Sequence, residues 1–161
     1  MALPDDRPKG LDSPVTVKVI KYMSRAQVAA FKATNGRLGA KWRIGAGRKK
    51  PVPVLLLEHV GRKSGKRYET PLLYMEDGAD LVVVASQGGL PRNPQWYANL
   101  RDHPDTSVRL KGTGKRQVRA RTATPDEREA LWPHLVDAYA DFAKYQTWTE
   151  RTIPVVVLEP R

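Results

Sequence analysis

The strongest constraint on the fold is a succession of short apolar segments separated by glycine-containing turns. Pro53–Val60, Arg67–Glu76 and Leu81–Ser86 are rich in β-branched, aromatic and leucine residues, with Gly61–Lys66 and Asp77-Gly78 between them. Runs of this length bounded by such turns predict antiparallel strands joined by hairpins. Six strands are expected, because three more segments have the same character: Thr106–Lys111, Gln117–Thr122 and Ile153–Leu158. Such a set favours a small barrel with helices over its surface.

Four helical segments flank these strands. In Pro14–Thr34, Val19, Ile20, Met23, Ala26, Ala30 and Phe31 share one side and four cations share the other. We expect the apolar side to pack on the core; a helix facing an anionic membrane is the alternative. Asn93-Pro94 predicts an N-cap followed by proline at N1. Thr124, Pro125 and Glu127 predict a capping box before a helix toward Tyr139, and a shorter helix ends near Trp148. Asn35–Lys50 is expected to be a loop.

The charge of the chain is one-sided. Residues 1–67 contain 16 Lys/Arg and 4 Asp/Glu, whereas residues 68–161 contain 12 and 13. No acidic residue lies between Ser13 and Leu57. This asymmetry predicts an anionic partner, which could be nucleic acid, a membrane surface or a polyanionic cofactor.

Composition excludes several kinds of site. The chain has no cysteine, which rules out disulfides and thiolate chemistry. His59, His103 and His134 lack metal-ligand spacing, and we expect them to be structural. No apolar run approaches the roughly 20 residues of a membrane span. The chain is expected to be one domain over residues 14–161, preceded by a flexible arm at 1–13. The arm lacks the apolar stretch of a secretion signal, which favours the cytoplasm.

Four short segments could carry chemistry. Gly61–Gly65 (GRKSG) is either a basic hairpin turn or an anion site, because successive N–H groups and two cations suit a phosphate or carboxylate. Ser86–Gly89 (SQGG) contains small residues that let a flat ring approach the backbone. Trp96, Tyr97 and Asn99 follow on a short helix. Tyr139, Phe142, Tyr145 and Trp148 form either a packing stripe or one wall of an aromatic pocket.

Three of these motifs, in order, resemble the deazaflavin-dependent nitroreductase family. They are LLLEHVGRKSGKRYETPLLY, LVVVASQGGLPRNPQWYANLRDHP and TWTERTIPVVVLEP, and the resemblance spans Pro14 to Pro160. It implies an α+β chain built on an antiparallel split β-barrel related to flavin reductases. It also implies coenzyme F-420, which has a phosphate and an oligoglutamate tail, as the cofactor.

The resemblance also implies roles for individual residues. The phosphate and tail would be held by Arg62, Lys63 and Ser64. The rest of the cofactor would lie against Tyr68, Thr70, Pro71, Leu72, Leu73, Ala85, Ser86, Gln87, Gln95, Trp96, Tyr97, Ala98 and Asn99. The substrate pocket would be formed by Tyr22, Tyr139, Phe142 and Tyr145. Tyr139 and Tyr145 are the expected catalytic residues, since either hydroxyl could supply a proton.

The implied activity is hydride transfer from reduced F-420 to a small hydrophobic acceptor, a quinone first and an activated enone or nitroaromatic next. This chain has Gln87 and Phe142 where familiar members of the family have Lys and Tyr, and it lacks the arginine usual near Tyr68. These differences bear on the substrate, nitroimidazoles in particular. The alternatives are an FMN- or haem-binding split barrel and a basic module for an anionic membrane. Nucleic-acid binding is weaker, because no base-stacking sheet motif is present.

Overall fold

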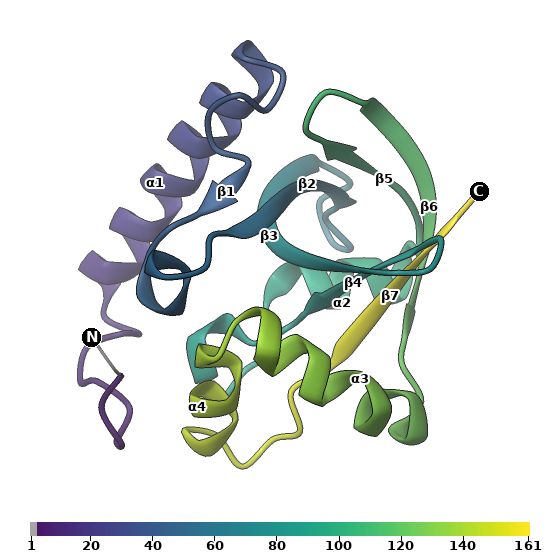
Figure 1. Ribbon diagram of the computed structural model, residues 1–161. Helices are drawn as coiled ribbons and strands as arrows, with labels where there is room; N and C mark the ends of the chain where they lie inside the picture. Colours follow the sequence, from purple (N-terminus) through teal and green to yellow (C-terminus); the bar gives the residue numbers. More distant parts are fainter. Residues whose placement is uncertain (1–2) are drawn as a thin grey trace.

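The computed structural model describes residues 3–161 and contains a closed antiparallel β-barrel flanked by four α-helices (Figure 1). The strands follow the order β1-β2-β3-β4-β7-β6-β5, and pairing of β2 with β5 closes the barrel. Their bounds are β1 Lys41–Trp42, β2 Val52–Val60, β3 Arg67–Asp77, β4 Asp80–Val84, β5 Asp105–Leu110, β6 Gly114–Thr122 and β7 Val155–Pro160. The predicted split barrel and its six strands are confirmed.

Two short elements lie in the segment expected to be a loop. β1 pairs with the start of β2, and a 3-10 helix, η1, spans Gly45–Arg48. Strand β1 has only two residues, so its sequence carries no alternation that could have revealed it. Pairing with β1 gives hydrogen-bond partners to backbone groups at the start of β2 that would otherwise be unpaired.

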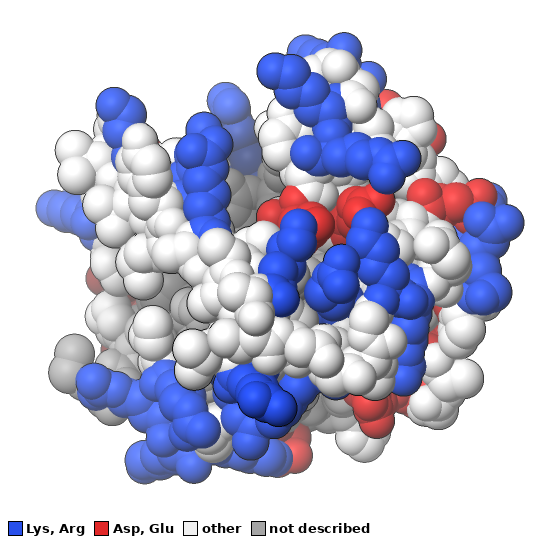
Figure 2. Space-filling view, turned by 90° about the horizontal axis from the view of Figure 1, so that it is seen from above, with Lys and Arg blue, Asp and Glu red and all other residues white. Residues whose placement is uncertain are grey.

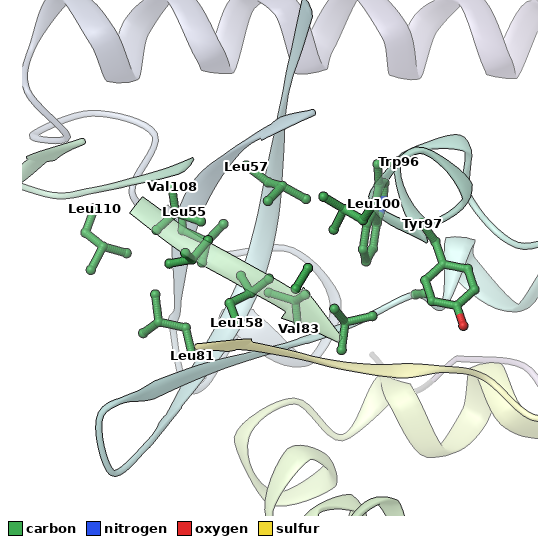
Figure 3. Packing of buried hydrophobic residues seen from close by; sticks show 14 residues of the cluster. Leu55, Leu57, Leu81, Val83, Trp96, Tyr97, Leu100, Val108, Leu110 and Leu158 are labelled. Carbon is green, nitrogen blue, oxygen red and sulfur yellow. The ribbon is translucent and has the colours of Figure 1, made fainter. Parts of the chain in front are cut away.

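The core has two layers that share strands β4 and β7. Inside the barrel, Leu55, Leu57, Val83 and Leu158 pack with Trp96 and neighbouring residues (Figure 3). Alternate residues of the same strands, Val82, Val84, Val155 and Val157, belong to a second cluster beneath α3 and α4. Both faces of β4 and β7 are therefore buried, which is why their sequences are continuous apolar runs.

The helices begin and end largely where the sequence predicts. They are α1 Pro14–Ala33, α2 Gln95–Asp102, α3 Pro125–Ala138 and α4 Asp141–Thr147. Thr124 and Glu127 form the predicted capping box of α3. The prediction for α2 was wrong by one residue: Pro94 is the N-cap and Asn93 does not cap the helix. The Asn93 amide oxygen instead accepts a hydrogen bond from Arg151 Nη1 at 2.8 Å.

The expected packing face of α1 was only partly right. The residues of α1 that are at least partly buried are Thr16, Ser24, Gln27, Val28, Ala30 and Phe31, and only Phe31 is fully buried. Ala30 and Phe31 belong to the predicted apolar side, but the centre of the buried face is rotated from it by roughly 60°, at 100° per residue. Val19, Ile20 and Met23, which were expected to be covered, are each at least half exposed. The helix runs along one side of the barrel (Figure 1) and contributes little to the core, since Phe31 is its one fully buried residue.

The segment before α1 contacts α4. Lys144 Nζ forms an ion pair with Asp5 Oδ1 at 2.7 Å, and Trp148 Nε1 donates to the Asp5 carbonyl at 3.0 Å. Flexibility of residues 1–13 in solution stays a prediction, and residues 1 and 2 lie outside the described part. None of the helices within residues 3–161 is long and apolar enough to cross a bilayer.

Candidate functional site

A cleft of about 320 Å³ lies between the barrel, α1 and α4. Each wall comes from a different element. Ser24 and Gln27 belong to α1, and Trp42 to β1. The remaining lining residues are Val54, Pro71, Leu72, Leu73, Val84, Ser86, Gln87, Gly88, Pro94, Trp96, Tyr139, Phe142 and Tyr145. A mostly apolar cleft of this size with a few polar groups is typical of a small-molecule site.

The cleft brings together residues from both groups that the sequence singled out. From the predicted cofactor set it contains Pro71, Leu72, Leu73, Ser86, Gln87 and Trp96, and from the predicted substrate set Tyr139, Phe142 and Tyr145. Local structure explains the arrangement. The loop containing Ser86 and Gln87 leaves the end of β4, and Trp96 lies in the first turn of α2. Phe142 and Tyr145 are three residues apart on α4, so they share one side of that helix.

The two tyrosines form a hydrogen-bonded pair. Trp42 Nε1 donates to Tyr139 Oη at 3.3 Å, and the Tyr139 and Tyr145 hydroxyls are 3.4 Å apart. Burial, followed by the bond to Tyr145, raises the pKa of Tyr139, and burial also raises the pKa of Tyr145. Both phenols are therefore protonated at neutral pH and can act as hydrogen-bond donors. Phe142 packs edge-on against Tyr139, with ring centroids 5.1 Å apart.

Several predicted residues do not line the cleft. Tyr22 is 65 % exposed. Ser24, which does line the cleft, is two residues further along and so points about 200° away from Tyr22. Tyr97 is buried, and its hydroxyl points away from the inner cluster and lies 2.9 Å from Thr122 Oγ1 (Figure 3). Ala85 is fully buried in the cluster inside the barrel and does not line the cleft.

The Gly61–Gly65 turn lies beside the cleft walls but is not among its lining residues. Arg62, Lys63 and Ser64 are all exposed on it. Gly65 N donates to Gly61 O at 2.8 Å, which closes the turn. A Cβ on Gly61 would lie 2.5 Å from Ser64 Oγ, so a side chain there would displace that hydroxyl. Of the other predicted cofactor residues, Tyr68 and Gln95 are exposed and Ala98 is half-buried.

A buried polar network connects this turn to the barrel. Asn99 is fully buried, and its Oδ1 accepts from Arg62 N at 3.1 Å. Its Nδ2 therefore donates to His59 Nδ1, 2.9 Å away. The remaining proton of neutral His59 then lies on Nε2, which donates to Thr70 Oγ1 at 2.9 Å. Asn99 and Thr70 thus have supporting contacts within the protein, which explains why a polar Asn occurs on the buried side of α2.

Sequence reasoning missed the cleft residues contributed by other elements. Trp42 lies in the segment expected to be a loop. Gln27 falls within the apolar side predicted for α1 and Ser24 at its edge, but as polar residues neither was named as part of that face. Val54, Val84 and Pro94 were also missed. The spacing of Ser24, Gln27, Val28 and Phe31, which is i, i+3, i+4 and i+7, was the available signal for this face. Within the described residues, no cluster of three or more His, Asp or Glu side chains could bind a metal ion.

His59 predicts a pH dependence of stability. Burial lowers its pKa from 6.5 to about 4. The folded protein therefore binds fewer protons than the unfolded chain between these values, so stability is complete above pH 6.5 and is lost as the pH falls toward 4. The loss is at most about 1.4 kcal/mol per pH unit. We expect His59→Asn, which keeps an acceptor for Asn99, to flatten this slope in urea unfolding between pH 6.5 and 4.5.

The matched control is His103→Asn, because His103 is exposed. This variant is expected to keep the slope of the unaltered protein. An unchanged slope in His59→Asn would mean that His59 does not account for the loss of stability in this pH range.

The chain matches proteins that share this fold. The model of the family described as F420H(2)-dependent quinone reductase matches residues 23–160. A Mycobacterium tuberculosis protein provisionally named F420H(2)-dependent quinone reductase Rv3178 is 57% identical over 119 residues, which cover 74% of this chain and 99% of the relative. F420H(2)-dependent quinone reductase Rv1261c of the same species is 37% identical over 140 residues, covering 85% and 89%.

A solved structure supports the same assignment. The structure of an F420-H2 dependent reductase, FDR-A, aligns with 40% identity and a TM-score of 0.61, covering 66% of this chain and 94% of that one. The family match extends over most of the chain, and the first of the curated relatives exceeds half identity. The chain therefore belongs to the F420H(2)-dependent quinone reductase family.

Proposed function

We propose that this protein transfers a hydride from reduced coenzyme F-420 to a quinone. The observation that carries the proposal is the single cleft in which Pro71, Leu72, Leu73 and the Ser86–Gly88 loop face Tyr139, Phe142 and Tyr145. A planar cofactor and a planar acceptor can stack between such apolar walls. The relatives that are named F420H(2)-dependent quinone reductases support the choice of both ligands.

The residues present fit F-420. Pro71, Leu72 and Leu73 provide an apolar strand surface for the ring system, and Gly88 has nothing within 4 Å of the position of a Cβ. The cationic Arg62 and Lys63 would hold the phosphate and the acidic tail, with the Ser64 hydroxyl beside them. The wider surface also suits an anion, since Figure 2 shows Lys and Arg side chains over much of one face, with fewer Asp and Glu. Charges on this scale attract a polyanion at a distance.

The chain itself contributes mainly orientation. When bound, the reduced deazaflavin supplies the hydride, because its ring has carbon where flavin has nitrogen at position 5. The Trp42 N–H donates to Tyr139 Oη, so the Tyr139 hydrogen is directed toward Tyr145 Oη. The Tyr145 hydrogen then remains free for an acceptor oxygen in the cleft. Tyr145 would hold the quinone carbonyl and provide the proton, and the walls would keep the reactants in register.

The test of this function is direct. Reduced F-420 is mixed with menadione, a soluble naphthoquinone, and oxidation of the cofactor is followed by absorbance, with separate titrations of F-420 and FMN. We expect oxidation that depends on enzyme and quinone. If FMN binds at micromolar levels and F-420 does not bind, the proposal fails.

Lys63→Glu should weaken F-420 binding, because it reverses a charge on the turn proposed to hold the anionic tail. We expect the Kd to rise about fivefold or more, the scale of a surface charge pair reversed in sign. The remaining affinity should also depend less on salt. Lys111→Glu is the matched control, because Lys111 is exposed on the β5–β6 turn. Equal affinities of the two variants would remove Lys63 from the site.

We further propose that α1 docks on an anionic bilayer surface. On its outer side, Val15, Val19, Tyr22 and Met23 are each at least half exposed. Lys18, Lys21 and Arg25 flank this stripe, and the helix has no acidic residue. An apolar stripe bordered by cations is typical of a helix that lies in the membrane interface. A quinone dissolved in the bilayer would then be close to the cleft, since the opposite side of α1 lines it.

Vesicle co-sedimentation can test this docking. Point variants are preferable to removing α1, because Ser24 and Gln27 of the same helix line the cleft. The double variant Lys18→Glu with Lys21→Glu should lower the affinity for vesicles of equal parts phosphatidylglycerol and phosphatidylcholine about tenfold or more. Val19→Ser with Met23→Ser should lower it by loss of apolar burial.

Leu38→Ser is the control for an exposed apolar residue outside α1, and its affinity should not change. Menadione reduction in detergent-free buffer should be equal in all these variants. Docking through α1 is excluded if the unaltered protein does not sediment with anionic vesicles, or if the variants sediment equally well.

A further inference from the structure

The loop that follows β4 has an unusual backbone. Gln87, Gly88 and Gly89 have φ values of 45°, 61° and 75° in succession. The left-handed region is favourable for glycine but not for a side chain such as that of Gln87. The loop also has little freedom on one side, because a Cβ on Gly89 would lie 2.7 Å from the Tyr145 carbonyl oxygen of α4. A loop of this kind keeps its conformation only when surrounding contacts hold it.

Arg151 provides those contacts. Its Nη2 donates to Ser86 O at 2.7 Å and its Nη1 to Ala85 O at 3.2 Å, at the start of the loop. Its Nε donates to Leu90 O at 2.9 Å, at the end of the loop. Nη1 also donates to Asn93 Oδ1 at 2.8 Å, just before α2. One guanidinium therefore connects both ends of the loop and the start of the next helix.

Neither charge alone nor a role in the cleft wall accounts for this arrangement. Arg151 does not line the cleft and takes part in none of the ion pairs within the described residues. A guanidinium has donors fixed in a plane and can bind several carbonyls at once, whereas the ammonium of lysine is a compact point charge. The contacts of Arg151 depend on the planar shape of its guanidinium. The four acceptors are three backbone carbonyls and one side-chain amide.

We propose that Arg151 is a positioning residue that holds the Ser86–Leu90 loop in the conformation that receives the cofactor. It acts through the loop, whose residues Ser86, Gln87 and Gly88 line the cleft, and it touches neither substrate nor cofactor. The inference rests on the proposed function only for the identity of the ligand. The order of the loop in the free protein is independent of it, and can be measured without any cofactor.

Arg151→Lys is the test, because it keeps the positive charge and removes the planar fork. Two quantities are measured. One is the Kd of F-420. The other is the hydrogen exchange of the Gly89 and Leu90 amides in protein without cofactor, because these amides donate to Ser86 O and Gln87 O within the loop. We expect the Kd to rise about tenfold or more, as for loss of a hydrogen bond to a charged group. We also expect faster exchange at both amides, while the amides of the capped helix α3 stay protected.

Arg119→Lys is the matched control. Arg119 donates to Asp105 Oδ1 on β5 and contacts neither the loop nor the segment that carries Arg151. It should change neither quantity. Adding 20 to 50 mM guanidinium, roughly the range that leaves proteins folded, should restore binding to Arg151→Ala but not to Arg151→Lys, whose side chain still fills the space. An electrostatic role would instead be satisfied by lysine.

The outcomes separate this inference from the proposed function. If the unaltered protein does not bind F-420, the proposed function fails, and the exchange measurement alone decides the role of Arg151. If it binds F-420 and Arg151→Lys binds within twofold of it with unchanged exchange, the positioning role is wrong. If Arg151→Lys does not fold, Asn93→Ala removes one of the four bonds and should give a smaller change of the same kind. Equal affinity and exchange in Asn93→Ala would then overturn the inference.

Discussion

Pairing of β2 on both of its edges is the constraint on which the rest of the structure depends. One edge pairs with β3 from Val54 to Val60, and the other pairs with β5 at Leu56 and Leu57. Because side chains alternate between the two faces of a strand, a slip of one residue would exchange Leu55 and Leu57, which pack inside the barrel, with Leu56, which packs against Phe31 of α1. The register is therefore fixed by burial, and it sets His59 opposite Tyr68 and Leu56 opposite Pro71. The strand wall of the cleft and the support of the Gly61–Gly65 turn both depend on this register.

The position of the cleft follows from the two layers of the core. Strands β4 and β7 bury one face in the barrel and the other beneath α3 and α4. The loop after β4 must leave this double layer at the seam between barrel and helices, and the cleft lies at that seam. Its walls are consequently mostly apolar, and its polar groups are a few hydroxyls, the amides of Gln27 and Gln87, and backbone atoms. A site built in this way suits catalysis by orientation more than by strong acids or bases.

Much of the fold was accessible from the sequence because its signals are local. The hairpin at Asp77-Gly78 and the capping box at Thr124 depend on neighbouring residues, and both form as predicted. The orientation of α1 is not local. Its apolar side was expected to face the core, but the barrel is already filled by its own strands and α2, so α1 contacts it through a narrower face containing Gln27 and Phe31. Hydrophobic periodicity indicates a helix but does not specify which side will be covered.

The site was predictable to a similar degree and for similar reasons. The strand and loop residues that follow a fixed register, such as Pro71 and Ser86, line the cleft, and their contact with the cofactor stays a prediction. Trp42 could not be placed, because a two-residue strand has no pattern and its contact with Tyr139 joins residues far apart in the chain. Asn93 was misassigned as a cap because its oxygen has a stronger donor in Arg151, on a distant segment. Long-range competition of this kind cannot be read from a short window of sequence.

The distribution of cations gives the one-sided charge a physical meaning. In the second half of the chain, Arg119, Arg121 and Arg161 are neutralised by carboxylates of the barrel and α3. In the part of the chain that the structure describes, no such ion pair involves Arg62 or Lys63 on the turn, or Lys18 on α1. Unpaired cations therefore occur on both of these surfaces. Salt would weaken the attraction of either surface for an anion. Only α1 adds an apolar stripe, so binding to a bilayer there would persist at ionic strengths that release a soluble polyanion from the turn.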